Sequence, residues 1–220
     1  MQMKQISSDT YTIAWFKLAE CVTRGERERA FGVYRLLSHS IDDRALALQL
    51  EGDLFLAFDM PQEAIGCFEK AALRYKQAGR LLEAASVFEH MCTLNSKELA
   101  YKKELLQLYA NLQSDVRVAD LACVLVQGHY AAQQFDAIRT IAPLIAYLDS
   151  YAAQAICYEK IVYILLLCSK DPELFCMPFV EYMVSALLQH GNDQLLQQTL
   201  QKLKHTHDGL YQAAVRILEK

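Results

Sequence analysis

Glycine and proline are scarce in this sequence, with only 8 Gly and 4 Pro among 220 residues. All-β folds need a turn every few residues, and these two residue types dominate such turns. Their scarcity therefore argues against an all-β fold and favours long helices joined by tight turns. Because 53% of the residues are hydrophobic and 22% are charged, the chain can bury a large core and is not disordered.

A basic cluster and a long apolar segment are also missing. The net charge is −4, and the most charged run, 24–29, mixes both signs, so we expect no nucleic-acid partner. The longest apolar run, 161–168, is far shorter than the roughly 20 residues that cross a bilayer, so we predict no membrane insertion. The polar segment 1–10 has no apolar core of a secretory signal.

Paired cysteines are absent: the seven cysteines include no CxxC spacing, and their number is odd. Most of them occupy apolar positions of helical patterns, where a free thiol packs as a small hydrophobic group. This usage is typical of a reducing compartment. We therefore expect a cytoplasmic, intracellular protein with neither a disulfide framework nor a thiolate zinc site.

Signatures of catalysis are missing as well, since none of GxGxxG, GxxxxGK[ST], HExxH or GxSxG occurs. His205 and His207 lie near an expected turn, and two imidazoles without further ligands are more typical of a solvated turn than of a metal site. We predict no enzyme activity, no catalytic residue, no metal and no cofactor. An enzyme with a new kind of helical site has no sequence feature in its favour.

Helical periodicity is what the sequence does contain, from residue 11 to residue 218. Short turn signals interrupt it, and helices joined by short turns become antiparallel neighbours. The pattern predicts about 11–13 helices. The turns are expected at 24–25, 58–61, 78–80, 95–96, 113–115, 132–134, 169–172 and 190–192.

Several turns are followed by the same pair of residues. An alanine comes five residues after the turn residue, and a larger or apolar residue follows four positions later. The pairs are Ala30/Tyr34, Ala64/Phe68, Ala84/Phe88, Ala119/Cys123 and Ala137/Ile141. This spacing puts both residues on one helix face, where the alanine lets a neighbouring helix approach and the larger side chain fills the groove.

The first two copies are 34 residues apart, from Ala30 to Ala64. In the segment 48–71, the expected first helix carries Gly52 and Phe55, and the second carries Ala64, Phe68 and Ala71. This segment resembles a tetratricopeptide repeat, and the resemblance covers about residues 11–95.

In the other copy, 11–40, the first helix would hold Trp15, Leu18 and Ala19. The stretch 71–88 is more weakly similar to the helical stacks of vesicle-fusion attachment proteins.

The resemblance implies an all-α, right-handed, tetratricopeptide-like superhelix of antiparallel helices. We expect a polar N-terminal arm over 1–10, regular hairpins over 11–95, and more irregular hairpins of the same solenoid over 96–220. Pro143 and Pro178 fall inside helical patterns, where proline bends or ends a helix, so we expect irregularity after about residue 140. No polar capping helix is evident, so a complete protein and the N-terminal part of a longer repeat protein are equally compatible with the sequence.

In tetratricopeptide stacks the first helix of each hairpin lines the concave face. The residues that share the outward face of each expected first helix are found by helical spacing from Ala19, Gly52 and Leu106. Thr23 and Ala110 fall on this face, and most of our candidate partner-binding residues come from it. These are Phe16, Glu20, Gln49, Asp53, Leu56, Lys103, Gln107 and His129. Family members that bind acidic chaperone tails have basic and amide residues at such places, whereas Glu20 and Asp53 would repel an anionic ligand.

The sequence therefore predicts a non-catalytic adaptor or scaffold that binds a basic or apolar peptide or helix of a partner protein. Two alternatives stay open: a structural subunit of a larger assembly, or a secretion-type chaperone. Either would bind through helix edges or through the apolar C-terminal helix at 210–218, and a homo-oligomer is compatible with this arrangement.

Overall fold

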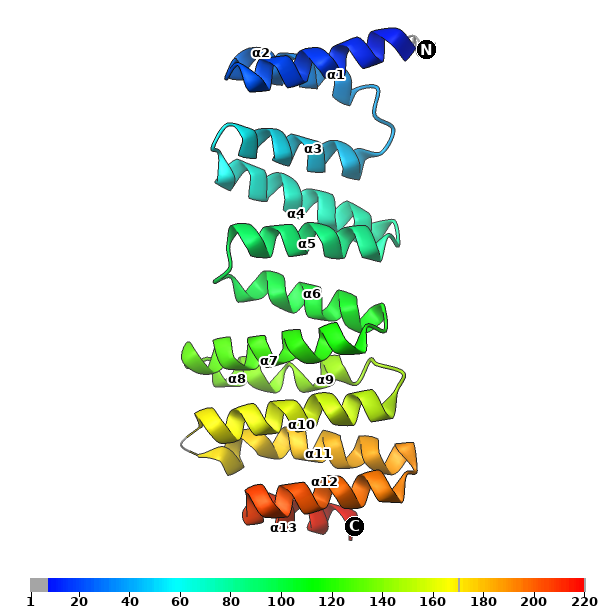
Figure 1. Cartoon of the computed structure of the whole chain (residues 1–220), viewed down its shortest axis with the longest axis vertical. Coiled ribbons are helices and arrows are strands. Elements are labelled where there is room, and N and C mark those ends of the chain that lie inside the picture. The colour runs from blue at the N-terminus through cyan, green and yellow to red at the C-terminus, as the bar shows by residue number, and fades with distance from the viewer. Residues whose placement is uncertain (1–7, 170, 220) are drawn as a thin grey trace. The chain divides into compact units, whose positions relative to one another are not determined.

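The structure of the protein is a computed structural model that describes residues 8–169 and 171–219 (Figure 1). All regular secondary structure in these residues is helical, which confirms the prediction of an all-α fold. The described residues form thirteen helices, and the predicted turns fall between helices or at their ends. Most of the predicted N-terminal arm lies outside the described residues, but its last residues, 8–10, already belong to the first helix.

The chain divides into two compact units, Met1–Ser96 and Lys97–Lys220. The first unit contains two hairpins and a fifth helix. Its helices are α1 (Ser8–Thr23), α2 (Arg27–Ser38), α3 (Arg44–Ala57), α4 (Pro61–Gln77) and α5 (Leu81–Leu94). Helix α1 packs on α2, α3 packs on α4, and α5 packs on α4.

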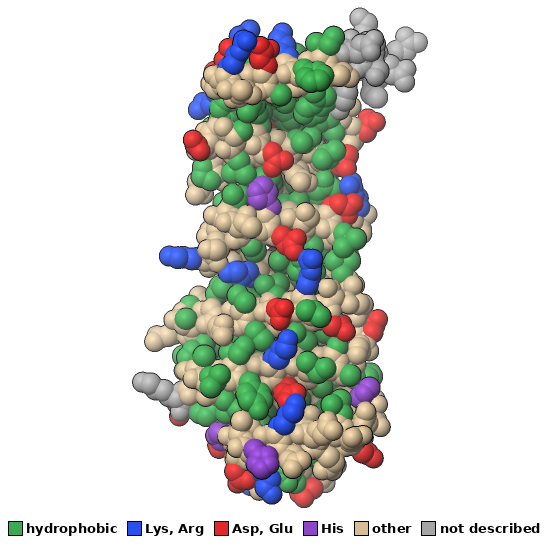
Figure 2. All heavy atoms as spheres, viewed as in Figure 1, with side chains coloured by type: hydrophobic (Ala, Val, Ile, Leu, Met, Phe, Trp, Pro, Cys, Tyr) green, Lys and Arg blue, Asp and Glu red, His purple; other side chains and the backbone are tan. Residues whose placement is uncertain are grey.

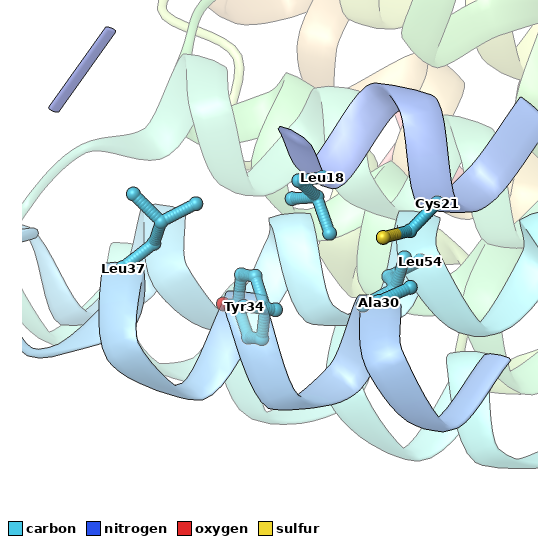
Figure 3. Packing of buried hydrophobic residues seen from close by; sticks show 6 residues of the cluster. All are labelled: Leu18, Cys21, Ala30, Tyr34, Leu37 and Leu54. Carbon is cyan, nitrogen blue, oxygen red and sulfur yellow. The ribbon is translucent and has the colours of Figure 1, made fainter. Parts of the chain in front are cut away.

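The core of the first unit begins where α1 and α2 meet (Figure 3). Leu18 and Cys21 of α1 point toward Ala30 and Tyr34 of α2, and Leu54 of α3 joins them. The Tyr34 hydroxyl donates a hydrogen bond to the Ala47 carbonyl of α3, which satisfies the polar group of a buried ring.

The second unit has two layers of helices. Its elements are α6 (Leu99–Asn111), α7 (Asp115–Ala131), α8 (Phe135–Arg139), α9 (Ala142–Ile145), α10 (Tyr151–Cys168), α11 (Pro172–His190), α12 (Asp193–Thr206) and α13 (Asp208–Leu218). Helices α7, α10 and α12 run in the same direction in one layer, and α9, α11 and α13 lie in the other (Figure 1).

The irregular part of the chain is shorter than predicted. It is confined to the short helices α8 and α9 and the loop at 146–150, after which α10 and α11 have 18 and 19 residues. Pro143 lies in the first turn of α9, where a missing N–H costs little. Helix α11 continues past Pro178 to His190, so of the two expected effects of this proline, ending the helix does not occur.

Two glutamine side chains hold the loop at 146–150 in place. The Gln154 side-chain amide, almost fully buried, donates to the Leu148 carbonyl at 2.6 Å. Gln113, in the turn between α6 and α7, donates to the Tyr147 carbonyl at 3.0 Å and accepts from the Asp149 N–H at 2.6 Å. These bonds supply partners for backbone groups that no helix satisfies.

Candidate functional site

The predicted residues of α1 lie at the surface. Phe16 is 74% exposed, and the exposed carboxylate of Glu20 forms an ion pair with Arg24 at 2.6 Å. Ala19, the small residue from which the candidates on this helix were counted, is exposed, and Leu18 is buried instead. The residue 34 positions before Gly52 is Leu18, so Leu18 and not Ala19 is the equivalent of Gly52 on α1. The candidates on α1 were therefore assigned from a position one residue too late.

On α3, Gly52 fixes how the helix meets α4. A Cβ atom at Gly52 would lie 2.6 Å from Cε1 of Phe68, whose ring is fully buried, so only glycine fits here. One turn before Gly52, the side-chain oxygen Oε1 of Gln49 accepts a hydrogen bond from the Tyr75 hydroxyl at 3.2 Å. The Gln49 side chain therefore helps to join α3 to α4.

Asp53 lies next to Gly52 and is exposed, and Leu56, one turn on, is half-buried. The Phe68 ring contacts the imidazole of His90 on α5, with ring centroids 4.9 Å apart. Partial loss of water raises the pKa of the Asp53 carboxyl above its usual value, and the charge of His90 opposes this shift.

The first unit thus brings Asp53 of α3 and His90 of α5 together around Phe68 of α4. The sequence analysis missed His90, because the contact depends on how α5 crosses α4 and no spacing along the chain signals it.

In the second unit, Lys103 and His129 line one groove between the start of α6 and the end of α7. Its volume is about 440 Å³, and its other lining residues are Lys97, Glu98, Leu99, Ala100, Ala132 and Gln134. The Lys103 ammonium donates to the Thr140 hydroxyl at 3.3 Å, and Nδ1 of the buried His129 lies 2.8 Å from Oε1 of Gln134. Lys103 is therefore the more accessible of the two.

Gln107 is exposed one turn beyond Lys103 on α6, as the count predicts. Ala110 is fully buried, so its expected place on the exposed face is wrong. The eight candidate residues fall into two sets: five belong to the first unit and three to the second.

Cysteine reactivity is low where the thiols are buried. Burial raises the pKa of Cys67 to about 11 and the pKa values of Cys157 and Cys176 to about 12, so these thiols stay protonated near neutral pH. Among the described residues, no group of three or more His, Cys, Asp or Glu side chains is placed to hold a metal ion.

Helix α10 is long and apolar enough, with a mean hydropathy of 1.4 over 18 residues, to cross a membrane by those two criteria alone. A core helix can have the same length and hydropathy. Helix α10 packs against α7 and α11, and its Lys160 and Glu159 pair with Asp120 of α7 and Lys202 of α12. Helix α10 thus packs within the second unit on one side, with 39% of its 18 residues buried.

Comparison of the sequence with protein-family models and with curated proteins found no match. The tetratricopeptide resemblance therefore stays a prediction that rests on the residues of this chain.

Proposed function

We propose that the protein is a non-catalytic interaction module of the tetratricopeptide type, a right-handed superhelix that binds a peptide or helix of a partner protein in the cytoplasm. The packing of Gly52 against Phe68 carries this proposal, because it is the small–aromatic contact that the resemblance expects between the two helices of a hairpin. The antiparallel hairpins of the first unit add support.

The partner segment is basic or apolar. Asp53 offers a negative charge beside the partly buried His90, and Phe16 offers an exposed aromatic ring. Exposed aromatic residues are frequent anchors in protein interfaces. An acidic segment would meet Asp53 and Glu20 unfavourably, although Arg24 offsets part of the charge of Glu20.

The test is affinity purification of the full chain from its native cells, followed by mass spectrometry. The double variant Glu20→Lys/Asp53→Lys should recover at least about tenfold less of the main partner, which is about 1.4 kcal/mol of binding energy. Glu28→Lys on α2 is the matched control, because its carboxylate is also exposed and also paired with an arginine. Equal recovery by wild type and the double variant would show that the first unit does not hold the partner.

The alternative of a structural subunit has one observation in its favour. An open groove of about 810 Å³ lies between the start of α11 and α13, and its lining includes Glu173, Leu174, His207 and Arg216. Leu174 is 57% exposed there. If this groove joins subunits, Leu174→Ser should lower the molar mass measured by light scattering without lowering the melting temperature.

A further inference from the structure

A single residue, His207, joins helix α12 to helix α13. Its N–H donates to the Leu203 carbonyl at the end of α12 at 2.7 Å, and Nδ1 of its imidazole accepts from the Leu210 N–H at 3.3 Å. The side chain therefore caps α13, a role that Ser, Thr, Asp and Asn fill most often. The cap satisfies one of the backbone N–H groups that the first turn of a helix leaves without a partner.

This hydrogen bond depends on the protonation state of the imidazole. A ring nitrogen accepts a hydrogen bond only while it carries no proton, and both nitrogens are donors in the imidazolium ion. A positive charge is also unfavourable at the N-terminus of a helix, where the helix dipole has its positive end. Protonation of His207 therefore removes the cap and places a repelled charge beside the Leu210 N–H.

The groove between the start of α11 and α13 offers the charged ring another partner. His207 lines this groove together with Glu173 of α11. A Cβ atom added at Gly209 would collide with Oε1 of Glu173 and would lie 3.2 Å from Cε1 of His207, so the carboxylate and the ring approach the same point. A short movement of the ring therefore exchanges a bond within α13 for an ion pair with α11.

Charged groups of both signs surround His207, and Figure 2 shows histidine, acidic and basic side chains gathered over α12 and α13. The carboxylates attract a protonated ring, whereas the cations oppose its charge. The Lys204 ammonium is held over the Tyr211 ring, 5.4 Å from its centre. The titratable and charged groups next to His207 along the chain or across the groove are Asp171 and Glu173 of α11, Lys204 and His205 of α12, and Asp208, Tyr211 and Arg216 of α13.

We propose that His207 is a pH-sensitive cap, which holds the first turn of α13 while its imidazole is neutral and releases that turn when the ring is protonated. The neutral ring accepts from the Leu210 N–H, and the imidazolium ion pairs with Glu173 instead. Imidazole ordinarily changes its charge between pH 5 and pH 8, so the cap is present at pH 8 and is lost as the pH falls through that range. Leu210 is fully buried, so release of this turn exposes an apolar side chain beside the groove.

Helix α12 contains a cap of the same geometry that does not titrate. Oδ1 of Asn192 accepts from the Leu195 N–H at 3.1 Å, three residues on, as Nδ1 of His207 does from the Leu210 N–H. The amide oxygen of asparagine remains an acceptor at pH 5 and at pH 8 alike. The Leu195 N–H is therefore an internal reference for the Leu210 N–H.

The test is hydrogen exchange of the backbone amides of the full chain, followed by NMR at pH 5 and pH 8 and corrected for the intrinsic pH dependence of exchange. The protection factor of Leu210 should fall about fivefold at pH 5, which corresponds to the typical loss of one helix cap. The protection factor of Leu195 should not change. In the variant His207→Asn, whose side chain caps at both pH values, Leu210 should stay protected at pH 5.

Three results would overturn the inference: equal protection of Leu210 at both pH values, an equal fall at Leu195, or a fall at Leu210 that persists in His207→Asn. In Glu173→Gln the loss of protection should need a lower pH, because the carboxylate that attracts the protonated ring is gone. An unchanged pH of loss would exclude Glu173 as the partner of the ring. The cap goes beyond the proposed function, since none of the eight candidate residues lies in α13, and failure of the purification test leaves these exchange rates unaffected.

Discussion

The two units use the same turn but arrange their side-chain sizes in opposite order. In five turns one residue has a positive φ, and an N–H one residue later bonds to a carbonyl five positions back. In these five turns the positive-φ residues are Gly25, Asp59 and Gly79 in the first unit, and Gln113 and Gln133 in the second. Gly191, at the end of α11, also has a positive φ.

Five residues after the positive-φ residue, the first unit places an alanine, and nine residues after it an aromatic ring. These pairs are Ala30/Tyr34, Ala64/Phe68 and Ala84/Phe88. The second unit places a branched residue first and an alanine second, in the pairs Val118/Ala122 and Ile138/Ala142. All ten residues are buried.

In these five turns one small and one large side chain are buried at the two positions, in either order. After Gly191 the same two positions hold Leu196 and Leu200, so the pair of sizes is not required after every such turn. Close packing requires that the facing surfaces match in shape, and either order can meet this requirement. The turn itself has the same backbone conformation and the same backbone hydrogen bond in both units. The shared turn accounts for the antiparallel helices within the second unit, although the resemblance to a 34-residue repeat fades there.

The largest effect is expected where the first unit depends on a single ring. Phe68→Ala should lower the free energy of unfolding by about 3–5 kcal/mol, because a fully buried aromatic ring is lost and a cavity remains. Gly52→Ala should cost about 1–3 kcal/mol in the wild-type chain, since the new methyl group meets the ring. Urea denaturation measures both.

In the Phe68→Ala background, Gly52→Ala should stop being destabilising, because the opposing ring is gone. Gly66→Ala on α4 is the matched control: a Cβ there has no neighbour within 4 Å, so the change should be neutral or stabilise by up to about 1 kcal/mol. If both glycines respond alike in the wild-type chain, the contact between Gly52 and Phe68 does not determine the stability of the first unit.

A smaller effect should follow from changing the size of one residue of such a pair. Ala64→Val in the first unit adds volume beside Phe68 and should cost about 1–3 kcal/mol by overpacking. Val118→Ala in the second unit removes volume beside Ala122 and should cost roughly 2 kcal/mol by leaving a cavity. Thermal and urea unfolding of the two variants measure these losses. If both units accept either residue without loss, the order of sizes has no structural role.

Much of the fold was predictable because it is local. Helical periodicity and the turn residues gave the all-α fold and the positions of the turns, since both depend on residues close together in sequence. The short helices α8 and α9 were not predicted as such, because their loop is held by Gln113 and Gln154 from other segments. Long-range hydrogen bonds of this kind leave no periodic signal.

The small–large pairs were predicted correctly in the first unit and displaced in the second. Counting for alanine chose Ala119 and Ala137, one residue away from Val118 and Ile138, which are buried five residues after the positive-φ residue. Ala119 and Ile141 of the predicted pairs are nevertheless buried. Ala137 and Cys123 are only half-buried. The sequence shows where alanines lie, but it does not show which residue of a turn has a positive φ. The buried pair lies five and nine residues after that residue, so its position has to be known first. The ion pairs Asp120–Lys160 and Glu159–Lys202 were also missed, because their partners are 40 and 43 residues apart on different helices.

The smallest effect is expected from removing the charge of one carboxylate in each unit, Asp53 in the first and Asp120 in the second. The raised pKa of Asp53 means that the folded state favours its protonated form, so its contribution to stability is full below the unfolded value of 3.8 and is lost as the pH rises through the folded value. At pH 7 the ionised group is therefore slightly unfavourable. Asp53→Asn should raise the free energy of unfolding at pH 7, and with it the melting temperature. The gain should be less than about 0.5 kcal/mol, because the side chain is exposed to solvent.

The gain should disappear near pH 3, where the aspartate is largely protonated and resembles asparagine in charge. Asp120→Asn in the second unit is the control, because this carboxylate pairs with Lys160 at 3.4 Å and its loss should leave the melting temperature unchanged or slightly lower. Differential scanning calorimetry at both pH values measures the two variants. A fall in melting temperature for Asp53→Asn at pH 7 would mean that the attraction of His90 outweighs the loss of water around Asp53, and the first-unit site would then contain a stabilising charge pair.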